Sequence, residues 1–257
     1  MALLQQDVVR GTAVVAARDL YRQVRHPGVL VSQGVQVVFF LLVFAVGFDG
    51  MIGSVDAVPF SAFVFPGIVA IQVVTIGVSS GLTYAFDREY GALRGMLIAP
   101  VPRLCLPLGK VVASALVAGA QSAVMLLFAP LLDLPLTVVT FFGGVLAFTL
   151  VSAVFGLLGV YLATAIKQVE TLQAAVQLAM YPLLFLSGSV FLPDSGPAWL
   201  LTVMRLNPMT YAVDGVRHLL LAPLGGAPRA FPLWLDVLVL AGLALVLGGM
   251  LRFRTGR

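Results

Sequence analysis

Six long apolar runs constrain the fold of this chain more than any other feature of its sequence. They cover residues 29–48, 60–85, 106–132, 138–166, 171–192 and 233–251. At 1.5 Å per residue, each run is long enough as a helix to cross about 30 Å of hydrocarbon. Charged residues make up only 10% of the chain, too few for the polar exterior of a soluble fold. The sequence therefore predicts an all-α, polytopic membrane protein with six transmembrane helices in a single domain, 1–257.

Basic residues are divided unequally between the two sides of this predicted bundle. The amino-terminal segment, the second and fourth connections and the carboxy-terminal tail (within 233–257) hold 12 of the 15 Lys and Arg residues. Because loops rich in Lys and Arg stay on the cytoplasmic side, both termini are expected in the cytoplasm. Arg outnumbers Lys 13 to 2, as in many GC-rich bacterial genomes. We therefore expect a multi-pass protein of the bacterial cytoplasmic (inner) membrane, and we interpret the net charge of +4 as topology, with no nucleic-acid partner.

Residues 12–25, within an amino-terminal segment 1–28, have the period of an amphipathic helix that ends before Pro27. We expect this helix to lie in the cytoplasmic interface, with its cations near anionic lipid; an ordinary surface helix is the alternative. The apolar face holds Val14, Ala17, Tyr21 and Val24, and the basic face holds Arg18, Arg22 and Arg25.

Several kinds of active site are absent from the sequence. The only Gly-Lys pair, Gly109-Lys110, is followed by Val111, so no P-loop is present to hold a nucleotide phosphate. The single Cys105 excludes an internal disulfide and a multi-Cys metal site. There is no HExxH motif, and we expect no nucleophile elbow and no pairing of a His with a carboxylate. The chain is predicted to be a non-enzyme without cofactors of its own.

Ionisable residues are rare in the apolar runs, with Lys167 and Glu170 at one end of a run and Asp236 near the other side. Proton- and ion-coupled carriers usually keep such residues inside the bilayer. Their scarcity argues against a stand-alone secondary carrier of a small hydrophobic compound, which remains the alternative function. A membrane enzyme or scaffold is a third possibility, but it requires a catalytic cluster that the sequence does not display.

Uncharged polar residues form one stripe on the second apolar run and one on the fifth. Each stripe has helical spacing and falls on one face. Unpaired amides in hydrocarbon are costly, so these faces should meet protein, through interhelical hydrogen bonds, or a weakly polar pathway for an amphipathic substrate. Pro182 is expected to kink or break the fifth helix. The stripes consist of Gln72, Thr75 and Ser79, and of Gln173, Gln177 and Tyr181.

The connection 193–232 contains the segment LNPMTYAVDGVRHLL at 206–220. Asn207 is a favoured N-cap and Pro208 a favoured first helical residue, while Asp214 and Arg217 have the spacing of a helical ion pair. We therefore expect two short helices on the outer side, re-entrant towards the membrane, that form either a lid over an exit or an inert cap.

The stretch FDREYGALRGMLIAPVPR at 86–103 carries a compact set of charges between two apolar runs. Asp87 is expected to cap a short helix that reaches residue 97, with negative charge in its first turn. Gly91 and Gly95 leave one face bare, and an exposed aromatic among charges is typical of an interface anchor. This predicts a docking element for another protein, with a solvated loop as the alternative. Its charged residues and aromatic anchor are Asp87, Arg88, Glu89, Tyr90, Arg94 and Arg103, with Lys110 just beyond.

In these motifs the chain resembles the membrane subunits of type-two ABC exporters. This group includes drug-resistance, nodulation-factor and polysaccharide export permeases. The resemblance covers nearly the whole chain. It rests on the amphipathic helix before the first run, FPG at 65–67, REYGALRGMLIAPVPR at 88–103 followed by LGK at 108–110, LSG at 186–188 and NPMTYAVDGVR at 207–217.

The resemblance implies that the helix in 86–103 is a coupling helix seated in a groove of a separate ATPase subunit, which binds ATP and Mg²⁺. It implies two ATPase copies, a second permease chain (homodimer or heterodimer), and a substrate pathway lined chiefly by the second and fifth spans. It also implies an outer gate in 193–232, where Asn207, Pro208, Tyr211, Asp214 and Arg217 lie. Carried over by position, the coupling residues are Glu89, Gly91, Leu93, Pro100 and Arg103.

Overall fold

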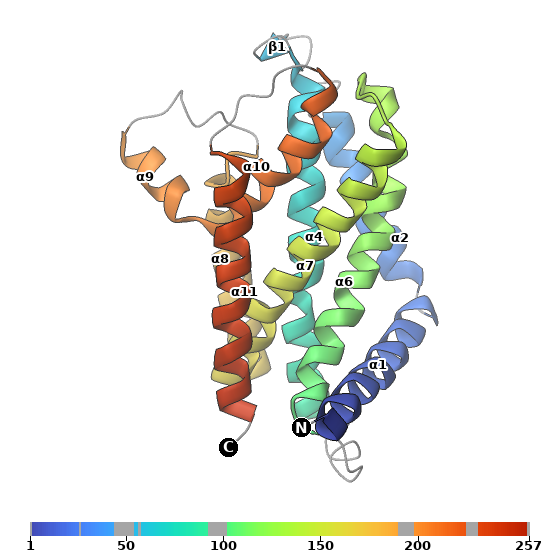
Figure 1. Cartoon of the computed structure of the whole chain (residues 1–257), viewed down its shortest axis with the longest axis vertical. Helices are drawn as coiled ribbons and strands as arrows, with labels where there is room; N and C mark the ends of the chain where they lie inside the picture. The colour runs from blue at the N-terminus through green and yellow to red at the C-terminus, as the bar shows by residue number, and fades with distance from the viewer. Residues whose placement is uncertain are drawn as a thin grey trace.

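A computed structural model describes residues 2–25, 27–43, 54–55, 58–91, 102–189, 198–224 and 231–255, and these are almost entirely helical (Figure 1). An antiparallel pair of two-residue strands, β1 (Ser54–Val55) and β2 (Val58–Pro59), precedes α4. Because helices make up nearly all of the described residues, the all-α prediction is confirmed. The helices are α1 (Ala2–Arg25), α2 (Pro27–Leu41), α4 (Phe60–Glu89), α6 (Cys105–Leu126), α7 (Val138–Ala165), α8 (Val169–Phe185), α9 (Ala198–Leu206), α10 (Pro208–Leu220) and α11 (Leu233–Thr255), with 3-10 turns η2 (Ala129–Leu132) and η4 (Ala222–Leu224).

Four described helices, α4, α6, α7 and α11, are long and apolar enough to cross a membrane. The chain is thus a multi-pass membrane protein by length and composition, but six spans are not confirmed. Helix α2 has 15 residues and α8 has 17; residues 44–48 and 190–192 of their predicted runs lie outside the described part. Helix α8 ends three residues after Pro182, where the missing backbone donor weakens the helix.

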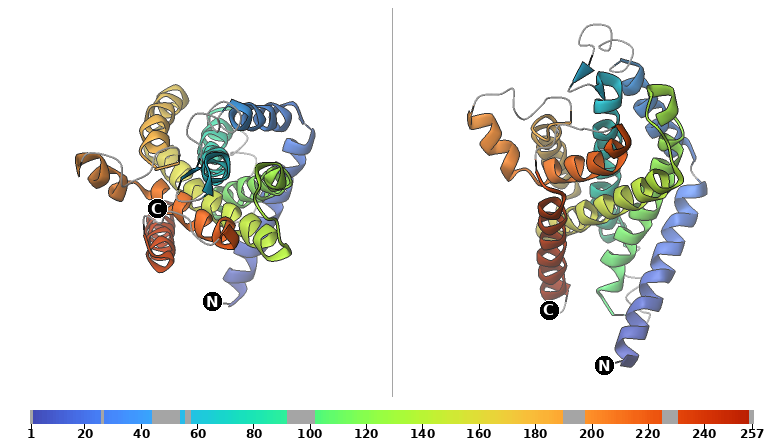
Figure 2. Two further views of the ribbon diagram at one scale, coloured as in Figure 1. Left: turned by 90° about the horizontal axis from the view of Figure 1, so that it is seen from above. Right: turned by 45° about the horizontal axis from the view of Figure 1, so that its top comes forward.

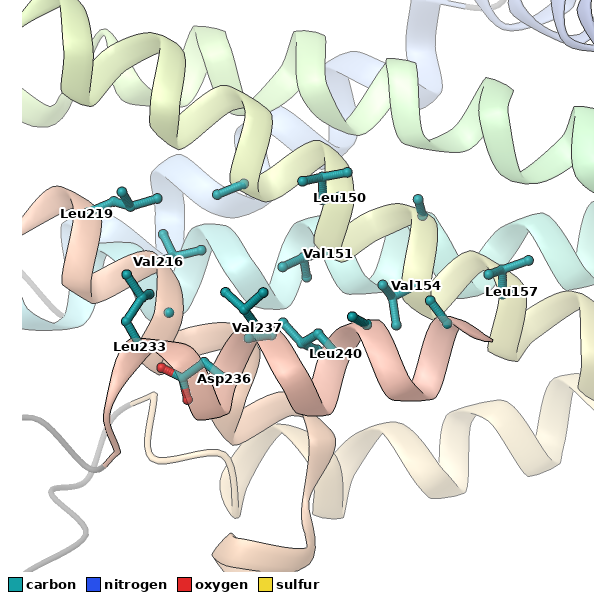
Figure 3. A pocket seen from close by; sticks show the side chains of 16 residues that line it. Leu150, Val151, Val154, Leu157, Val216, Leu219, Leu233, Asp236, Val237 and Leu240 are labelled. Atoms are coloured by element: carbon teal, nitrogen blue, oxygen red, sulfur yellow. The ribbon is translucent and has the colours of Figure 1, made fainter. Parts of the chain in front are cut away.

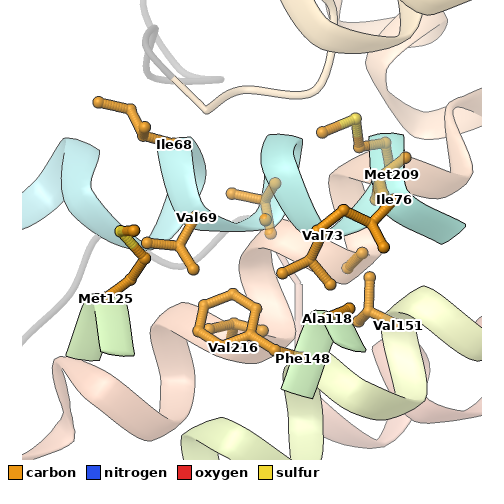
Figure 4. Packing of buried hydrophobic residues seen from close by; sticks show 14 of the residues in the cluster. Ile68, Val69, Val73, Ile76, Ala118, Met125, Phe148, Val151, Met209 and Val216 are labelled. Carbon is orange, nitrogen blue, oxygen red and sulfur yellow. The ribbon is translucent and has the colours of Figure 1, made fainter. Parts of the chain in front are cut away.

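Helix α4 is the centre of the bundle, with α6, α7, α8 and α10 in contact with it (Figure 2). In its most apolar window 89% of the residues are buried, against 11% in α11. Figure 4 shows Val69 and Val73 of α4 packed near Phe148 of α7 and Val216 of α10. Helix α4 is therefore shielded on most sides by protein, and α11 is peripheral.

Two ends of the bundle are distinguished below. The basal end carries Glu89, Cys105 and Ala165, and the apical end carries Phe60, Leu126 and Val138. Both α1 and the end of α11 lie at the basal end (Figure 1).

Small residues allow α4 and α7 to approach closely. A Cβ atom on Gly81 would overlap the carbonyl oxygen of Gly159, and one on Gly77 would overlap that of Ser152. The GVSSG sequence at 77–81 is a Gly-xxx-Gly pattern, which places two bare positions on one helical face. Because only glycine fits here, α4 and α7 pack backbone to backbone as one unit.

Helix α1 starts at Ala2, ten residues before the predicted start, and packs along α6. Val15 and Ala16 are buried against its neighbours, and Gly109 of α6 leaves room for Val15. The predicted apolar face stays exposed, with Val14 and Val24 each 70% exposed. The helix therefore has one face on the bundle and an apolar face available to lipid.

Candidate functional site

The stretch 86–91 does not begin a helix; it ends one. Helix α4 runs through Asp87 to Glu89, Tyr90 is its C-cap, and its backbone N–H donates to Phe86 O. Gly91 then adopts a φ of 77°, the left-handed conformation that commonly terminates a helix at a glycine. The prediction that Asp87 is an N-cap, with Glu89 and Tyr90 in a first turn, is therefore wrong. The helix continues because Asp87 finds cationic partners inside the bundle.

A group of charges with a buried centre, the basal cluster, joins three helices. It consists of Arg18, Asp19 and Arg22 of α1, Asp87 of α4 and Lys110 of α6. The Lys110 ammonium, with 4% of the side chain exposed, lies 2.7 Å from Asp19 Oδ2 and also contacts Asp87 Oδ2. Arg18 Nη2 donates to Asp19 Oδ1 at 2.8 Å and to Asp87 Oδ2 at 3.0 Å. Asp87 is thus part of this internal network and does not form an external docking surface.

The cluster also corrects the expected role of the basic face of α1. Arg18 and Arg22 turn to the buried Asp87, with Arg22 Nη1 at 3.5 Å from Asp87 Oδ1, while Arg25 lies over the ring of Tyr21. Two of the three arginines therefore fasten α1 to the bundle through charge-assisted contacts with a buried carboxylate.

Arg88 reaches across to the end of α7. Its Nη1 donates to Ala163 O at 2.7 Å, and its Nη2 donates to Ile166 O at 3.1 Å and Lys167 O at 2.7 Å. A cation at these carbonyls satisfies the free acceptors of a helix C-terminus and complements its dipole. Arg88 therefore links the end of α4 to the connection between α7 and α8.

Three of the predicted docking residues are accessible at the basal end. Tyr90 is 79% exposed, and its ring stacks on Phe86 at 6.0 Å; Glu89 and Arg103 are also exposed. Leu93, Arg94 and Pro100 lie outside the described residues. The accessible edge formed by Glu89 and Tyr90 directly continues the most buried helix of the bundle.

The two polar stripes differ in their surroundings. On α4, Gln72 is buried, whereas the hydroxyls of Thr75 and Ser79 donate to carbonyls of their own helix, Ile71 O and Ile76 O. The α8 stripe, Gln173, Gln177 and Tyr181, is exposed throughout. The α8 stripe therefore lies on a face that the rest of the described chain does not cover.

At the apical end, α10 begins as predicted. Asn207 Oδ1 accepts from Met209 N at 2.9 Å, and Pro208 is the first helical residue. Asn207 Nδ2 donates to Leu183 O of α8 at 2.9 Å, and Tyr211 Oη donates to Arg205 O at 2.7 Å. The N-terminus of α10 is thereby tied to both α8 and α9.

Arg217 brings together three motifs that are distant in the sequence. Its Nη1 and Nη2 donate to Gly188 O at 2.9 Å and Ser189 O at 2.8 Å, and its guanidinium lies 3.9 Å from the centroid of the Phe63 ring. Gly67, in FPG, lies so close to Ser189 that an added Cβ would be 2.8 Å away. Burial lowers the pKa of Arg217 to about 10, and Asp214 favours its charge, so it remains a cation at pH 7.

His218 overturns the expectation that no His pairs with a carboxylate. Asp214 and His218 are four residues apart on α10, and His218 Nε2 lies 3.8 Å from Oδ2 of both Asp214 and Asp236. The i, i+4 spacing was visible in the sequence, but the partner on α11 was not. This group, the apical triad, also places Asp236 in protein, at 1% exposure.

An apolar cavity of about 370 Å³ lies between α7, α10 and α11 (Figure 3). Aliphatic side chains such as Leu150, Val154, Val216 and Leu240 line it, and Asp236 lies at its edge. This cavity lies away from the two polar stripes, whose residues do not line it.

Comparisons with known proteins agree with this architecture. The family described as ABC-2 type transporter matches residues 10–221. The ycf38 protein of Cyanophora paradoxa is 27% identical over 214 residues, 80% of this chain and 72% of the relative. The daunorubicin resistance ABC transporter permease protein DrrB1 of Streptomyces coeruleorubidus is 27% identical over 234 residues, 82% and 77% of the two chains.

The inner membrane transport permease YadH of Escherichia coli K12 is 22% identical over 207 residues, 79% of each chain. The family match covers far more than half of the sequence and includes the basal cluster, the end of α4 and α10. The chain therefore belongs to the ABC-2 type transporter family, whose members are transmembrane permease subunits without an ATPase of their own.

Proposed function

We propose that this chain is the permease subunit of an ATP-driven exporter in the bacterial cytoplasmic membrane, with its basal end and both termini in the cytoplasm. A separate ATPase, present in two copies, binds ATP and Mg²⁺, and a second permease chain, identical or different, completes the assembly. The observation that carries the proposal is the exposed edge of Glu89 and Tyr90, which is continuous with the buried central helix.

The contacts at the end of α4 suggest how a displacement of the Glu89–Tyr90 edge would be transmitted to the neighbouring helices. Glu89 and Tyr90 end α4, which is packed backbone to backbone with α7 at Gly81. Arg88 holds the α7–α8 connection, and Lys110 and Asp87 hold α1 and α6. A displacement delivered by closure of the ATPase pair would therefore move these helices together, as a rigid-body switch between inward-open and outward-open states.

We infer that the substrate is hydrophobic or amphipathic and moves along the α4 and α8 stripes. The exposed Gln173, Gln177 and Tyr181 would face the second permease chain across the pathway, and membrane lipid would cover the remaining apolar surface. DrrB1 is named for daunorubicin resistance, which among drug-like, lipid-like and glycan-linked cargoes supports a drug-like one. Helix α10, with Asn207, Tyr211 and Arg217, would act as the outer gate.

The double variant Glu89→Ala/Tyr90→Ala tests the docking edge. It removes a charge and a largely exposed aromatic ring without touching the buried contacts of α4, so the chain should fold normally. Because interface anchors commonly contribute 2 kcal/mol or more, we expect affinity for the ATPase to fall by about 30-fold or more. The measurement is a titration of purified ATPase against the chain in nanodiscs.

Tyr21→Ala is the matched control, since Tyr21 is a 60% exposed aromatic of α1 at the same end of the bundle. It should leave ATPase affinity within about twofold of the original. Unchanged ATPase binding and transport in the Glu89/Tyr90 variant would refute the docking role.

A further inference from the structure

The apical triad has an electrostatic feature that the permease function does not use. Asp214 and His218 of α10 and Asp236 of α11 each offer a ligand atom, and these three atoms lie within 4.8 Å of one another. Both carboxylate oxygens of Asp236 are buried and have no hydrogen-bond partner among the described residues. A buried carboxylate without a partner is costly, so these oxygens are suited to hold a cation or a proton.

Among the described residues, the charged groups around the triad do not give the Asp236 carboxylate a hydrogen-bond partner. Arg217 uses both Nη atoms on the carbonyls of Gly188 and Ser189. Asp214 Oδ2 accepts from Phe231 N at 2.8 Å, and His218 Nε2 donates to Phe231 O at 2.9 Å. When both carboxylates are ionised, they and a neutral imidazole carry a charge of about −2, and a bound divalent cation would offset it.

We propose that Asp214, His218 and Asp236 form a binding site for a divalent transition-metal ion of the zinc class. Imidazole favours Zn²⁺, Co²⁺ or Ni²⁺ over Mg²⁺ and Ca²⁺, and two carboxylates with a His are ordinary zinc ligands. Ligands at about 2.0–2.1 Å from a tetrahedral ion lie roughly 3.4 Å apart. The two His218–carboxylate separations of 3.8 Å therefore need to shorten by only about 0.4 Å.

To bind the ion, His218 has to replace the hydrogen bond of its Nε2 with a bond from Nε2 to the metal. The neutral ring changes tautomer, so that its proton moves from Nε2 to Nδ1. The hydrogen bond to Phe231 O is then given up and the Nε2 lone pair coordinates the ion, with no net loss of a proton from the ring. His218 is the most accessible of the three, with 10% of its side chain exposed against 4% for Asp214 and 1% for Asp236. The ion therefore reaches the site past His218, and once bound it links α10 to the start of α11.

Metal binding to the full chain, purified in nanodiscs and stripped with a chelator, tests the site. Zn²⁺ retained after dialysis should approach one ion per chain, and added Co²⁺ should give the visible absorption of a low-coordinate site. Asp236→Asn and His218→Gln should each weaken binding by tenfold or more, because each removes a ligand. Zn²⁺ should raise the Tm of the unsubstituted chain but of neither variant.

Asp133→Asn is the control, because Asp133 follows η2 at the apical end and is not part of the triad; it should bind metal like the unsubstituted chain. Two results would overturn the proposal: no ion retained by the unsubstituted chain, or equal retention by the variants. Asp236→Asn at full stability without retained metal would assign the buried oxygens to a shared proton instead. None of these readouts depends on an ATPase or on transport.

Discussion

Replacing Gly81 with Val is expected to separate α4 from α7 and to abolish transport. The added Cβ meets the carbonyl oxygen and Cα of Gly159, which are backbone atoms and cannot rotate away. Overpacking of this kind typically costs about 1–3 kcal/mol, and a β-branched side chain against backbone should reach about 3 kcal/mol or more. The free energy of unfolding in mixed micelles measures this loss.

Gly248→Val is the matched control for that variant. Gly248 lies in α11, where nothing comes within 4 Å of an added Cβ, so both variants carry the same intrinsic cost of valine in a helix. We expect the control to stay within about 0.5 kcal/mol of the original chain. Equal stability of the two variants would contradict the close packing of α4 and α7.

Replacing Lys110 with Met is expected to cost about 3–5 kcal/mol, because it removes the buried cation that two buried carboxylates share. Asp19 and Asp87 then face each other with only Arg18 and Arg22 nearby, and these are 42% and 65% exposed. Chemical unfolding of the purified chain measures the loss, and limited proteolysis of α1 should show earlier cleavage.

Two further variants separate a role of Lys110 in the cluster from a general effect of charge. Lys167→Met removes an exposed cation at the same end and should change stability by less than about 0.5 kcal/mol. The triple variant Lys110→Met/Asp19→Asn/Asp87→Asn removes the buried charges together and should recover most of the loss. A fully stable Lys110→Met chain would show that the cluster does not hold α1.

The fold class was predictable because the length of an apolar run and its lack of charged residues can be read from that run alone. The start of α10 was predictable for the same reason, since Asn207-Pro208 is a local signal for a helix N-terminus. The role of Asp87 was assigned wrongly, because the local sequence around an N-cap Asp and around an ion-paired Asp in the last turn of a helix is similar. Only the fold shows that Arg18 and Lys110 lie beside Asp87.

Most contacts between residues of different helices could not be predicted from the sequence. Nothing local to Arg217 indicates Gly188 and Ser189, and nothing local to His218 indicates Asp236, because each contact depends on how two helices are placed. The α4–α7 packing is the exception, because the Gly77-xxx-Gly81 pattern is a local signal of close helix approach.

ATP hydrolysis in proteoliposomes tests whether this chain is a permease driven by a separate ATPase. The purified chain alone should hydrolyse no ATP, since it has no P-loop. The chain reconstituted with its ATPase should show ATP hydrolysis that is stimulated by a transported compound, and ATP-dependent movement of at least one member of a panel of amphipathic test compounds. Substrate-stimulated hydrolysis by this chain alone, or transport that proceeds at full rate without the ATPase and ATP, would contradict the account.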